Sequence, residues 1–105
     1  MCVGKSVEEH FLQRKKKVID LIKSFNLQYE EIGIFGSYAR GDYKSTSDID
    51  FCIVTQERPE SFISGALREE AELLKADIVF VSPEFFNTST SNFAKHLRKD
   101  YRRVL

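Results

Sequence analysis

Two aspartates separated by one residue, Asp48 and Asp50, are the side chains best placed to do chemistry in this sequence. They open an apolar, β-branched and aromatic run that predicts a strand over 48–54. Side chains at positions i and i+2 of a strand project to the same face, so the two carboxylates lie side by side. Two like charges this close repel each other, and burial strengthens the repulsion. A divalent cation relieves it directly, because Mg²⁺ prefers oxygen ligands.

A third aspartate, Asp77, opens another predicted strand, over 77–81. Acidic residues at the mouth of a buried strand are unusual unless they are paired. If this strand lies beside the strand of 48–54, three carboxylates form one cluster. Such a cluster can hold two metal ions about 3.5–4 Å apart, the arrangement that clamps the attacking and leaving oxygens of a phosphoryl transfer. The three aspartates are therefore a candidate site for divalent cations, Mg²⁺ or Mn²⁺.

The dipeptide Gly36-Ser37 is the candidate phosphate-binding partner of these acids. It follows a short apolar strand predicted over 31–35, and residues 38–41 allow one or two helical turns. Glycine lets the backbone approach a ligand closely, and a strand that turns into a helix offers unpaired N–H groups to an anion. The Ser37 hydroxyl adds a donor, and Arg40, Lys44 or both could reach phosphate oxygens.

The stretch 36–50 resembles the signature of the nucleotidyltransferase superfamily that includes DNA polymerase beta, and in particular its minimal nucleotidyltransferase branch. That signature is Gly-Ser, ten residues and then Asp-x-Asp; here Gly36-Ser37 is followed by ten residues and by Asp48-Ile49-Asp50. Asp77 stands where the family's third carboxylate strand belongs. The resemblance covers about residues 30–82. It implies an α/β (α+β) fold with a small mixed β-sheet and helices packed on one face, which we expect to form a single domain over residues 1–105.

The resemblance also implies a role for each signature residue. Gly36 and Ser37 would hold the triphosphate of ATP or another nucleoside triphosphate. Asp48 and Asp50 would ligate both Mg²⁺ ions. Asp77 would ligate the ion near the attacking hydroxyl and help to deprotonate it.

Two neighbouring residues are less clearly assigned. Arg40 either contacts phosphate or braces the aspartates through ion pairs, and both alternatives stay open. Tyr38 occupies a position where many relatives carry a basic residue, so one phosphate contact of the family is missing here.

The activity implied by the resemblance is transfer of a nucleoside monophosphate, AMP from ATP, to an acceptor hydroxyl. Members of the minimal branch often act as antitoxins that modify a tyrosine of a helical HEPN-type ribonuclease toxin. No second domain that would grip an acceptor is recognisable, so we expect a partner polypeptide to supply it. An antitoxin that neutralises by binding alone and a nucleotidyltransferase for small molecules are the alternatives.

Composition narrows the class of protein further. The 105 residues are 42% hydrophobic and 30% charged, which favours one globular domain over a disordered chain. No apolar run is long enough to span a membrane, and no signal peptide is recognisable, so we expect a cytoplasmic protein. Sixteen basic residues against sixteen acidic ones argue against stable nucleic-acid binding. The two cysteines make no disulfide framework, and Cys52 is expected in the core.

The remaining elements are predicted to be helical. A capping box at Ser6 and Glu9 begins a helix over about 7–25, and apolar spacing predicts another over 60–74. Ser82-Pro83 is a helix start, and 87–92 is a loop. A last helix is expected to carry an apolar stripe and, on its outer side, a basic flank that steers an acidic partner. The stripe comprises Phe93, Leu97, Tyr101 and Val104, and the flank comprises Lys95, Arg98, Lys99, Arg102 and Arg103.

Overall fold

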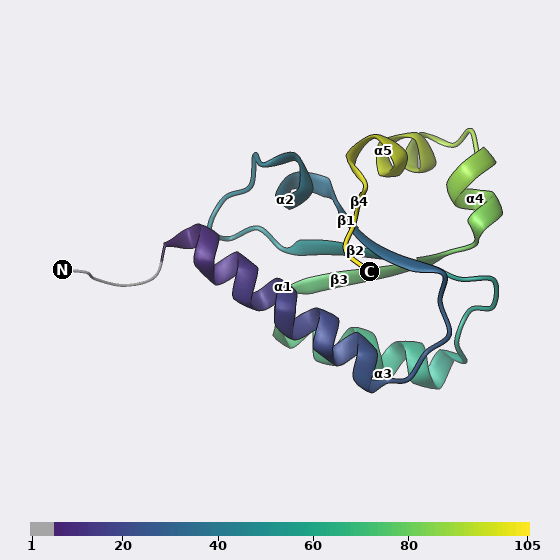
Figure 1. Cartoon of the computed structure of the whole chain (residues 1–105), viewed down its shortest axis with the longest axis horizontal. Coiled ribbons are helices and arrows are strands. Elements are labelled where there is room, and N and C mark those ends of the chain that lie inside the picture. The colour runs from purple at the N-terminus through teal and green to yellow at the C-terminus, as the bar shows by residue number, and fades with distance from the viewer. Residues whose placement is uncertain (1–5) are drawn as a thin grey trace.

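The computed structural model describes residues 6–105 and shows a four-stranded mixed sheet between two groups of helices (Figure 1). Cys2, the other of the two cysteines, for which the sequence predicts a place in a frayed end, lies outside the described residues. The elements in chain order are α1 (Val7–Ser24), β1 (Glu31–Phe35), α2 (Gly36–Arg40), β2 (Ile49–Val54), α3 (Ser61–Leu73), β3 (Ala76–Val81), α4 (Pro83–Thr88), α5 (Asn92–Asp100) and β4 (Arg102–Arg103).

The strands lie in the order β3-β2-β1-β4. β1 is antiparallel to both of its neighbours, whereas β2 and β3 are parallel and are joined by the crossover helix α3. The predicted small mixed sheet is therefore confirmed. The parallel pair is the part of the sheet that concerns function, because β2 and β3 carry the conspicuous aspartates.

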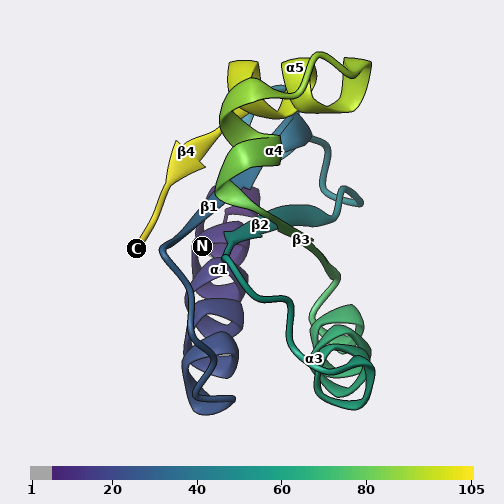
Figure 2. The same cartoon turned by 90° about the vertical axis from the view of Figure 1, so that its right-hand side faces the viewer.

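Alternation along the strands gives the sheet two apolar faces. In β2, Phe51 and Ile53 belong to the core that α1 and α3 cover, whereas Cys52 and Val54 belong to a second cluster with residues of α4 and α5. Figure 2 shows the two longer helices on one side of the sheet and α4 and α5 on the other. The helices thus pack on both faces, where the sequence led us to expect one. Both faces are covered because β2 is apolar on both sides beyond Asp50.

The first helix begins as predicted. The Ser6 hydroxyl accepts a hydrogen bond from the Glu9 N–H at 3.2 Å, and two acidic residues occupy the first turn. Asn26, beyond the other end, has the left-handed backbone that ends helices (φ 56°). Phe11, Val18 and Ile22 are the buried residues of this helix.

The C-terminal segment differs from the prediction. α5 ends at Asp100, and Tyr101 takes an extended backbone (φ −62°, ψ 133°), so Tyr101 and Val104 do not continue a helical stripe. The Tyr101 ring lies against Gly33 and its hydroxyl donates to the Glu31 carboxylate. The next two residues then pair with β1 as β4, since β1 would otherwise leave its outer backbone groups unpaired.

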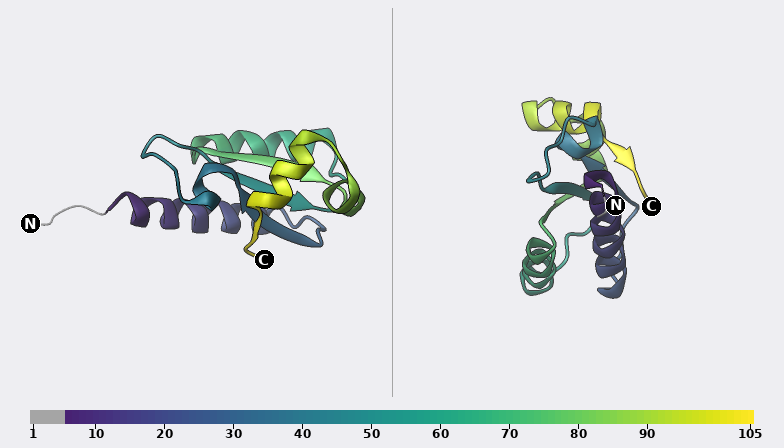
Figure 3. Two further views of the ribbon diagram at one scale, coloured as in Figure 1. Left: turned by 90° about the horizontal axis from the view of Figure 1, so that it is seen from above. Right: turned by 90° about the vertical axis from the view of Figure 1, so that its left-hand side faces the viewer.

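The last helices bring the chain back toward the first part of the sheet. Seen from above and from the side, the end of α5 lies beside the short helix α2 (Figure 3). α4 runs to Thr88, into the segment predicted as a loop. None of the helices within residues 6–105 combines the length and apolar character needed to cross a membrane.

Candidate active site

The two aspartates at the centre of the candidate site face each other across parallel strands. Asp50 of β2 is in register with Asp77 of β3, and neighbouring strands are about 4.8 Å apart. Both carboxylates project to the face that also carries Cys52 and Val79, since these alternate with the core residues of the opposite face. Asp48, two residues before Asp50, is exposed at the end of β2. The three predicted carboxylates therefore lie near the N-terminal ends of the neighbouring strands β2 and β3.

The charges of this cluster act most strongly on Asp50, which is half-buried. Burial, followed by the negative charges of Asp77 and Asp48, raises the pKa of Asp50 to about 6, while Arg40 opposes the shift. A carboxylate that is hard to ionise in the free protein is stabilised when a cation approaches. The electrostatics of the site therefore favour a bound positive charge.

Gly36 lies directly beside the Asp50 carboxylate. A Cβ at position 36 would overlap one Asp50 carboxylate oxygen and lie 3.3 Å from its Cγ. The backbone of Gly36 is also left-handed, with φ of 77°. Position 36 thus requires glycine both for its backbone conformation and for its close approach to Asp50. The two ends of the Gly-Ser…Asp-x-Asp signature are in contact.

Ser37 lies in the first turn of α2. Phe35, the residue before this helix, caps it without a side-chain hydrogen bond. The helix is closed at Gly41, which has a φ of 87° and whose N–H donates to the carbonyl of Ser37 at 3.0 Å. Tyr38 of the same helix does not face the carboxylates; its ring stacks on Phe11 with centroids 5.1 Å apart. Tyr38 therefore anchors α2 to α1.

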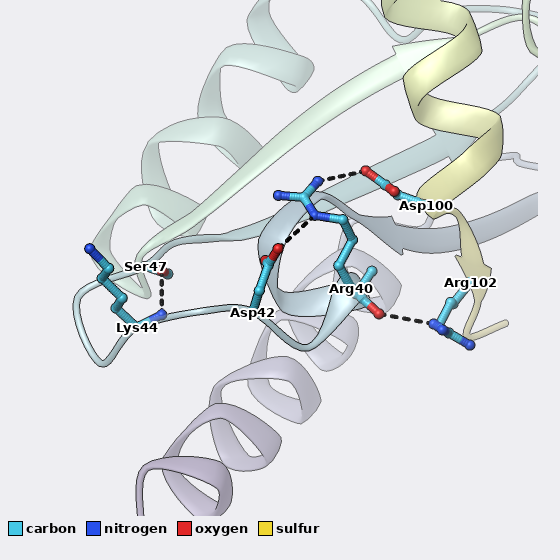
Figure 4. A network of polar contacts seen from close by, with 7 residues as sticks. Arg40, Asp42, Lys44, Ser47, Asp100 and Arg102 are labelled. Atoms are coloured by element: carbon cyan, nitrogen blue, oxygen red, sulfur yellow. Dashed lines mark hydrogen bonds and ion pairs between the residues drawn. The ribbon is translucent and has the colours of Figure 1, made fainter.

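Arg40 is tied to two acids outside the aspartate cluster. Its Nε donates to Asp42 at 3.1 Å and its Nη1 donates to Asp100 at 2.7 Å (Figure 4). The backbone carbonyl of Ala39 accepts from Nε of Arg102 at 3.0 Å. These contacts join α2 to the end of α5. The proposed direct bracing of the aspartates through ion pairs with Arg40 is thus not seen, although its charge still acts on Asp50.

Arg14 of α1 holds the two segments that lead into the aspartates, a role that sequence reasoning missed. Its guanidinium donates to the carbonyl of Ser47 at 3.2 Å, and Ser47 immediately precedes Asp48. It also donates to the carbonyls of Leu74 at 3.2 Å and Lys75 at 2.9 Å, just before β3. In the sequence Arg14 is indistinguishable from its basic neighbours at 15–17, so no signal could have identified it.

A hollow of about 530 Å³ opens beside Asp50 and Asp77. Besides these two aspartates, the hollow is lined by residues of β1, α3, β3 and α5, namely Phe35, Arg68, Glu72, Ala76, Ile78, Val79 and Phe93. Phe93 was expected in the core stripe of the last helix, yet 45% of it is exposed and it meets Phe35 edge-on with ring centroids 6.0 Å apart. The site therefore has a charged side and an aromatic side.

The carboxylates form an incomplete set of metal ligands. Within residues 6–105, no three His, Cys, Asp or Glu side chains are arranged to enclose a metal ion by themselves. The donor type fits Mg²⁺, which binds through one or two carboxylates together with substrate phosphates and water. The residues present thus suit a cation that arrives with a phosphate-bearing ligand.

Two arginines of the predicted basic flank, Arg98 and Arg102, donate hydrogen bonds to backbone carbonyls of neighbouring segments. Arg98 donates to the carbonyls of Phe86 at 2.8 Å and Ser89 at 2.7 Å, which fastens α4 to α5. Arg102 is held by Ala39. These two arginines therefore support the fold as well as contributing charge to the flank, and steering by the flank stays a prediction.

A mixed sheet with aspartates on β2 and β3 beside a glycine-serine turn is typical of proteins that move phosphate-containing groups. Comparison with known families agrees: the family described as "nucleotidyltransferase domain" matches residues 15–102. That range includes the whole Gly-Ser…Asp-x-Asp signature and Asp77. The chain belongs to the nucleotidyltransferase domain family, which confirms the predicted class and fold.

Individual relatives support the same assignment. A Methanocaldococcus jannaschii protein described as a "putative protein adenylyltransferase" is 33% identical over 67 residues, 56% of this chain and 62% of the relative. The chain thus spans less than two thirds of that relative's length. A crystal structure of a "putative nucleotidyltransferase" from Sulfolobus solfataricus is 27% identical with a TM-score of 0.58, covering 98% of this chain and 89% of that one.

A third comparison shows the same fold in a complex. The structure of a tri-AMPylated Shewanella oneidensis HEPN toxin with an MNT antitoxin contains a chain that matches at a TM-score of 0.58. The match covers 88% of this chain and 69% of that one at 17% identity, so it concerns the fold alone.

Proposed function

We propose that the chain transfers AMP from ATP to a hydroxyl group of a partner protein. The observation that carries this proposal is the register of Asp50 with Asp77, next to Gly36 at the turn into α2. A triphosphate bound at Gly36 and Ser37 would have its α-phosphate over Asp50. The carboxylate edge would then lie at the bond that has to break.

The reaction forms one bond and breaks one. The acceptor oxygen attacks the α-phosphorus, the bond from that phosphorus to the oxygen bridging to the β-phosphate breaks, and pyrophosphate leaves. The acceptor proton passes to Asp77 or to solvent. Two Mg²⁺ ions held by Asp48, Asp50 and Asp77 with phosphate oxygens, or Mn²⁺ in their place, would neutralise the charge that develops on these oxygens.

The other signature residues position the nucleotide. Ser37 donates its hydroxyl to a phosphate oxygen, and Gly36 lets the backbone come close. Arg40, while held by Asp42 and Asp100, adds positive charge near Asp50 and gives electrostatic support without direct contact with phosphate. Phosphoryl transfer depends chiefly on such positioning and charge.

The acceptor we propose is a tyrosine of a HEPN-type toxin, for which the chain would be the antitoxin. Support comes from the relative described as a protein adenylyltransferase and from the likeness to a chain in a complex whose HEPN toxin carries AMP.

The test is incubation of the chain with ATP, Mg²⁺ and the recombinant HEPN-type partner, followed by mass mapping of the partner. AMP on a tyrosine of the partner is expected, and the Asp48→Asn/Asp50→Asn double variant should abolish it. A partner that is neutralised without modification would instead show an antitoxin acting by binding alone. AMP attached only to a small molecule from cell extract would indicate a small-molecule nucleotidyltransferase.

A further inference from the structure

The hollow beside the aspartates continues as a groove along β3. A second hollow of about 290 Å³ is lined by Val79, Phe80, Val81, Ser82, Phe85 and Phe93. It shares Val79 and Phe93 with the hollow that contains Asp77. The two hollows therefore adjoin at these residues, and together they are called the β3 groove, which extends from Asp77 to Ser82. That stretch of strand is about 16 Å long at roughly 3.3 Å per residue.

The groove follows an open edge of the sheet. β3 pairs with β2 on one side, and within residues 6–105 no strand pairs with its other side. The carbonyl of Lys75 accepts from Ile49 and that of Val81 from Thr55, so odd-numbered residues of β3 point toward β2. Even-numbered residues consequently direct their backbone groups outward. Arg68 confirms this direction, since its Nε donates to the carbonyl of Ile78 at 3.2 Å.

The chemistry of the proposed transfer assigns this edge to the acceptor. Phe35, Asp50 and Asp77 lie in one row across β1, β2 and β3. Gly36 follows Phe35 at the β1 end of this row and lies against the Asp50 carboxylate. In an in-line displacement the attacking and leaving oxygens are on opposite sides of the phosphorus. If pyrophosphate leaves on the side of Gly36, the acceptor has to approach from the side of Asp77. The β3 groove begins at that point.

The lining of the groove indicates what kind of acceptor fits. Beyond Asp77, the residues that line the second hollow are apolar or aromatic apart from Ser82. Phe93 is 45% exposed, and its ring contacts Phe35 and Phe85. Such partly exposed aromatic rings are typical anchors for apolar side chains of a partner. A length of about 16 Å matches an extended peptide of about five residues rather than a single small acceptor.

We propose that the β3 groove binds an extended segment of the acceptor polypeptide, with its hydroxyl side chain at Asp77 and the adjoining apolar side chains against Phe93 and Phe85. This inference rests on the proposed AMP transfer and adds to it the surface that selects the acceptor. Phe93 is thereby a specificity-determining residue, whereas nucleotide binding depends on the other end of the row.

The test compares Phe93→Ala and Phe93→Gln with Phe62→Ala, a control whose ring is 84% exposed on α3 outside the groove. Rates of AMP incorporation are measured against concentration of the HEPN-type partner and, separately, of ATP. Both Phe93 variants should raise the KM for the partner by about tenfold or more, which is the usual effect of truncating an aromatic anchor that becomes buried when the partner binds. The KM for ATP should change several-fold less, and Phe93→Leu should recover most of the loss.

The outcomes separate this inference from the function on which it rests. Equal effects of the Phe93 and Phe62 variants on the KM for the partner would overturn the groove while leaving AMP transfer established. Release of AMP and pyrophosphate without label on the partner would also overturn it. Absence of any chemistry at the α-phosphate of ATP would overturn both.

Discussion

Gly36 and Asp50 are packed so closely that no side chain can be added at position 36 without displacing the carboxylate of Asp50. The contact joins the turn that would hold the triphosphate to the strand that would hold the metal ions. Gly36 also has a φ of 77°, which side-chain-bearing residues rarely adopt. Position 36 is therefore the most sensitive glycine of the described chain for the proposed function.

Replacing Gly36 by alanine should weaken ATP binding in the presence of Mg²⁺ by at least about tenfold, because Asp50 has to move. The strained backbone should also cost about 1–2 kcal/mol of stability. Gly41→Ala is the matched control: it has a similar φ of 87°, but nothing lies within 4 Å of its Cβ. Calorimetric titration with ATP and denaturant unfolding measure both quantities. Equal loss of ATP affinity in the two variants would contradict the role of the Gly36–Asp50 contact.

The raised pKa of Asp50 predicts a pH-dependent stability. Because its pKa is about 6 in the folded protein against an ordinary 3.8, the folded state binds this proton more tightly than the unfolded chain. The contribution of Asp50 to stability therefore falls as pH rises from about 4 to about 6 and stays low above that. Asp50→Asn should be more stable than the parent chain above about pH 6, and the difference should shrink toward pH 4.

Urea unfolding of both proteins across this pH range, without divalent ions, measures the difference. Glu57→Gln is a suitable control, since Glu57 is exposed and lies away from the aspartates. A stability difference between Asp50→Asn and the parent that does not change with pH would show that Asp50 titrates normally.

The incomplete ligand set predicts that metal and nucleotide bind together. Asp48, Asp50 and Asp77 alone should bind Mg²⁺ weakly, and ATP phosphate oxygens should complete the octahedral shell. Calorimetry of ATP binding should therefore show a much higher affinity with Mg²⁺ than with EDTA. Asp77→Asn should reduce this difference. Equal affinity in both conditions would exclude a metal role for the carboxylates.

Arg14 should affect both stability and nucleotide binding, although its hydrogen bonds go to backbone carbonyls and not to the carboxylates. Removing its guanidinium in Arg14→Ala leaves the carbonyls of Ser47, Leu74 and Lys75 without their charged donor. The loss should cost about 1–3 kcal/mol of stability. It should also weaken binding of ATP with Mg²⁺, because Asp48 follows one held segment and Asp77 the other.

Arg14→Lys retains the charge but not the planar fork, so it should recover little of either property. Lys17→Ala, on the exposed part of α1, is the control and should leave both unchanged. Denaturant unfolding and nucleotide titration provide the measurements. Full nucleotide affinity in a folded Arg14→Ala protein would show that the two segments hold their positions without the guanidinium.

The residues with strict local requirements were predictable from the sequence. Asp48 and Asp50 share a face because strand side chains alternate, and the apolar run beginning at Asp77 marked the neighbouring strand. The helix over 7–25 followed from its cap and its apolar spacing, and the structure places it at Val7–Ser24. These patterns depend on neighbouring residues only.

Other features depend on contacts between distant segments. β4 exists because the outer edge of β1 accepts Arg102 and Arg103, and two exposed arginines carry no strand pattern. Phe93 fits a core stripe as well as a groove wall, so only the packing of α5 across the sheet decides its exposure. Arg40 was assigned to phosphate or to the aspartates, and its partner Asp100 is sixty residues away.

The most direct measurement uses ATP radiolabelled either at the α- or at the γ-phosphorus, with the chain, Mg²⁺ and the HEPN-type partner. Transfer of AMP predicts that label from the α-phosphorus appears on the partner and that label from the γ-phosphorus appears only in pyrophosphate. The Asp48→Asn/Asp50→Asn double variant should abolish both the labelling of the partner and the release of labelled pyrophosphate. Phosphorylation, in contrast, would place the γ-label on the partner. Label on the partner from the γ-phosphorus, or α-label that persists in the double variant, would contradict nucleotidyl transfer at Asp48, Asp50 and Asp77.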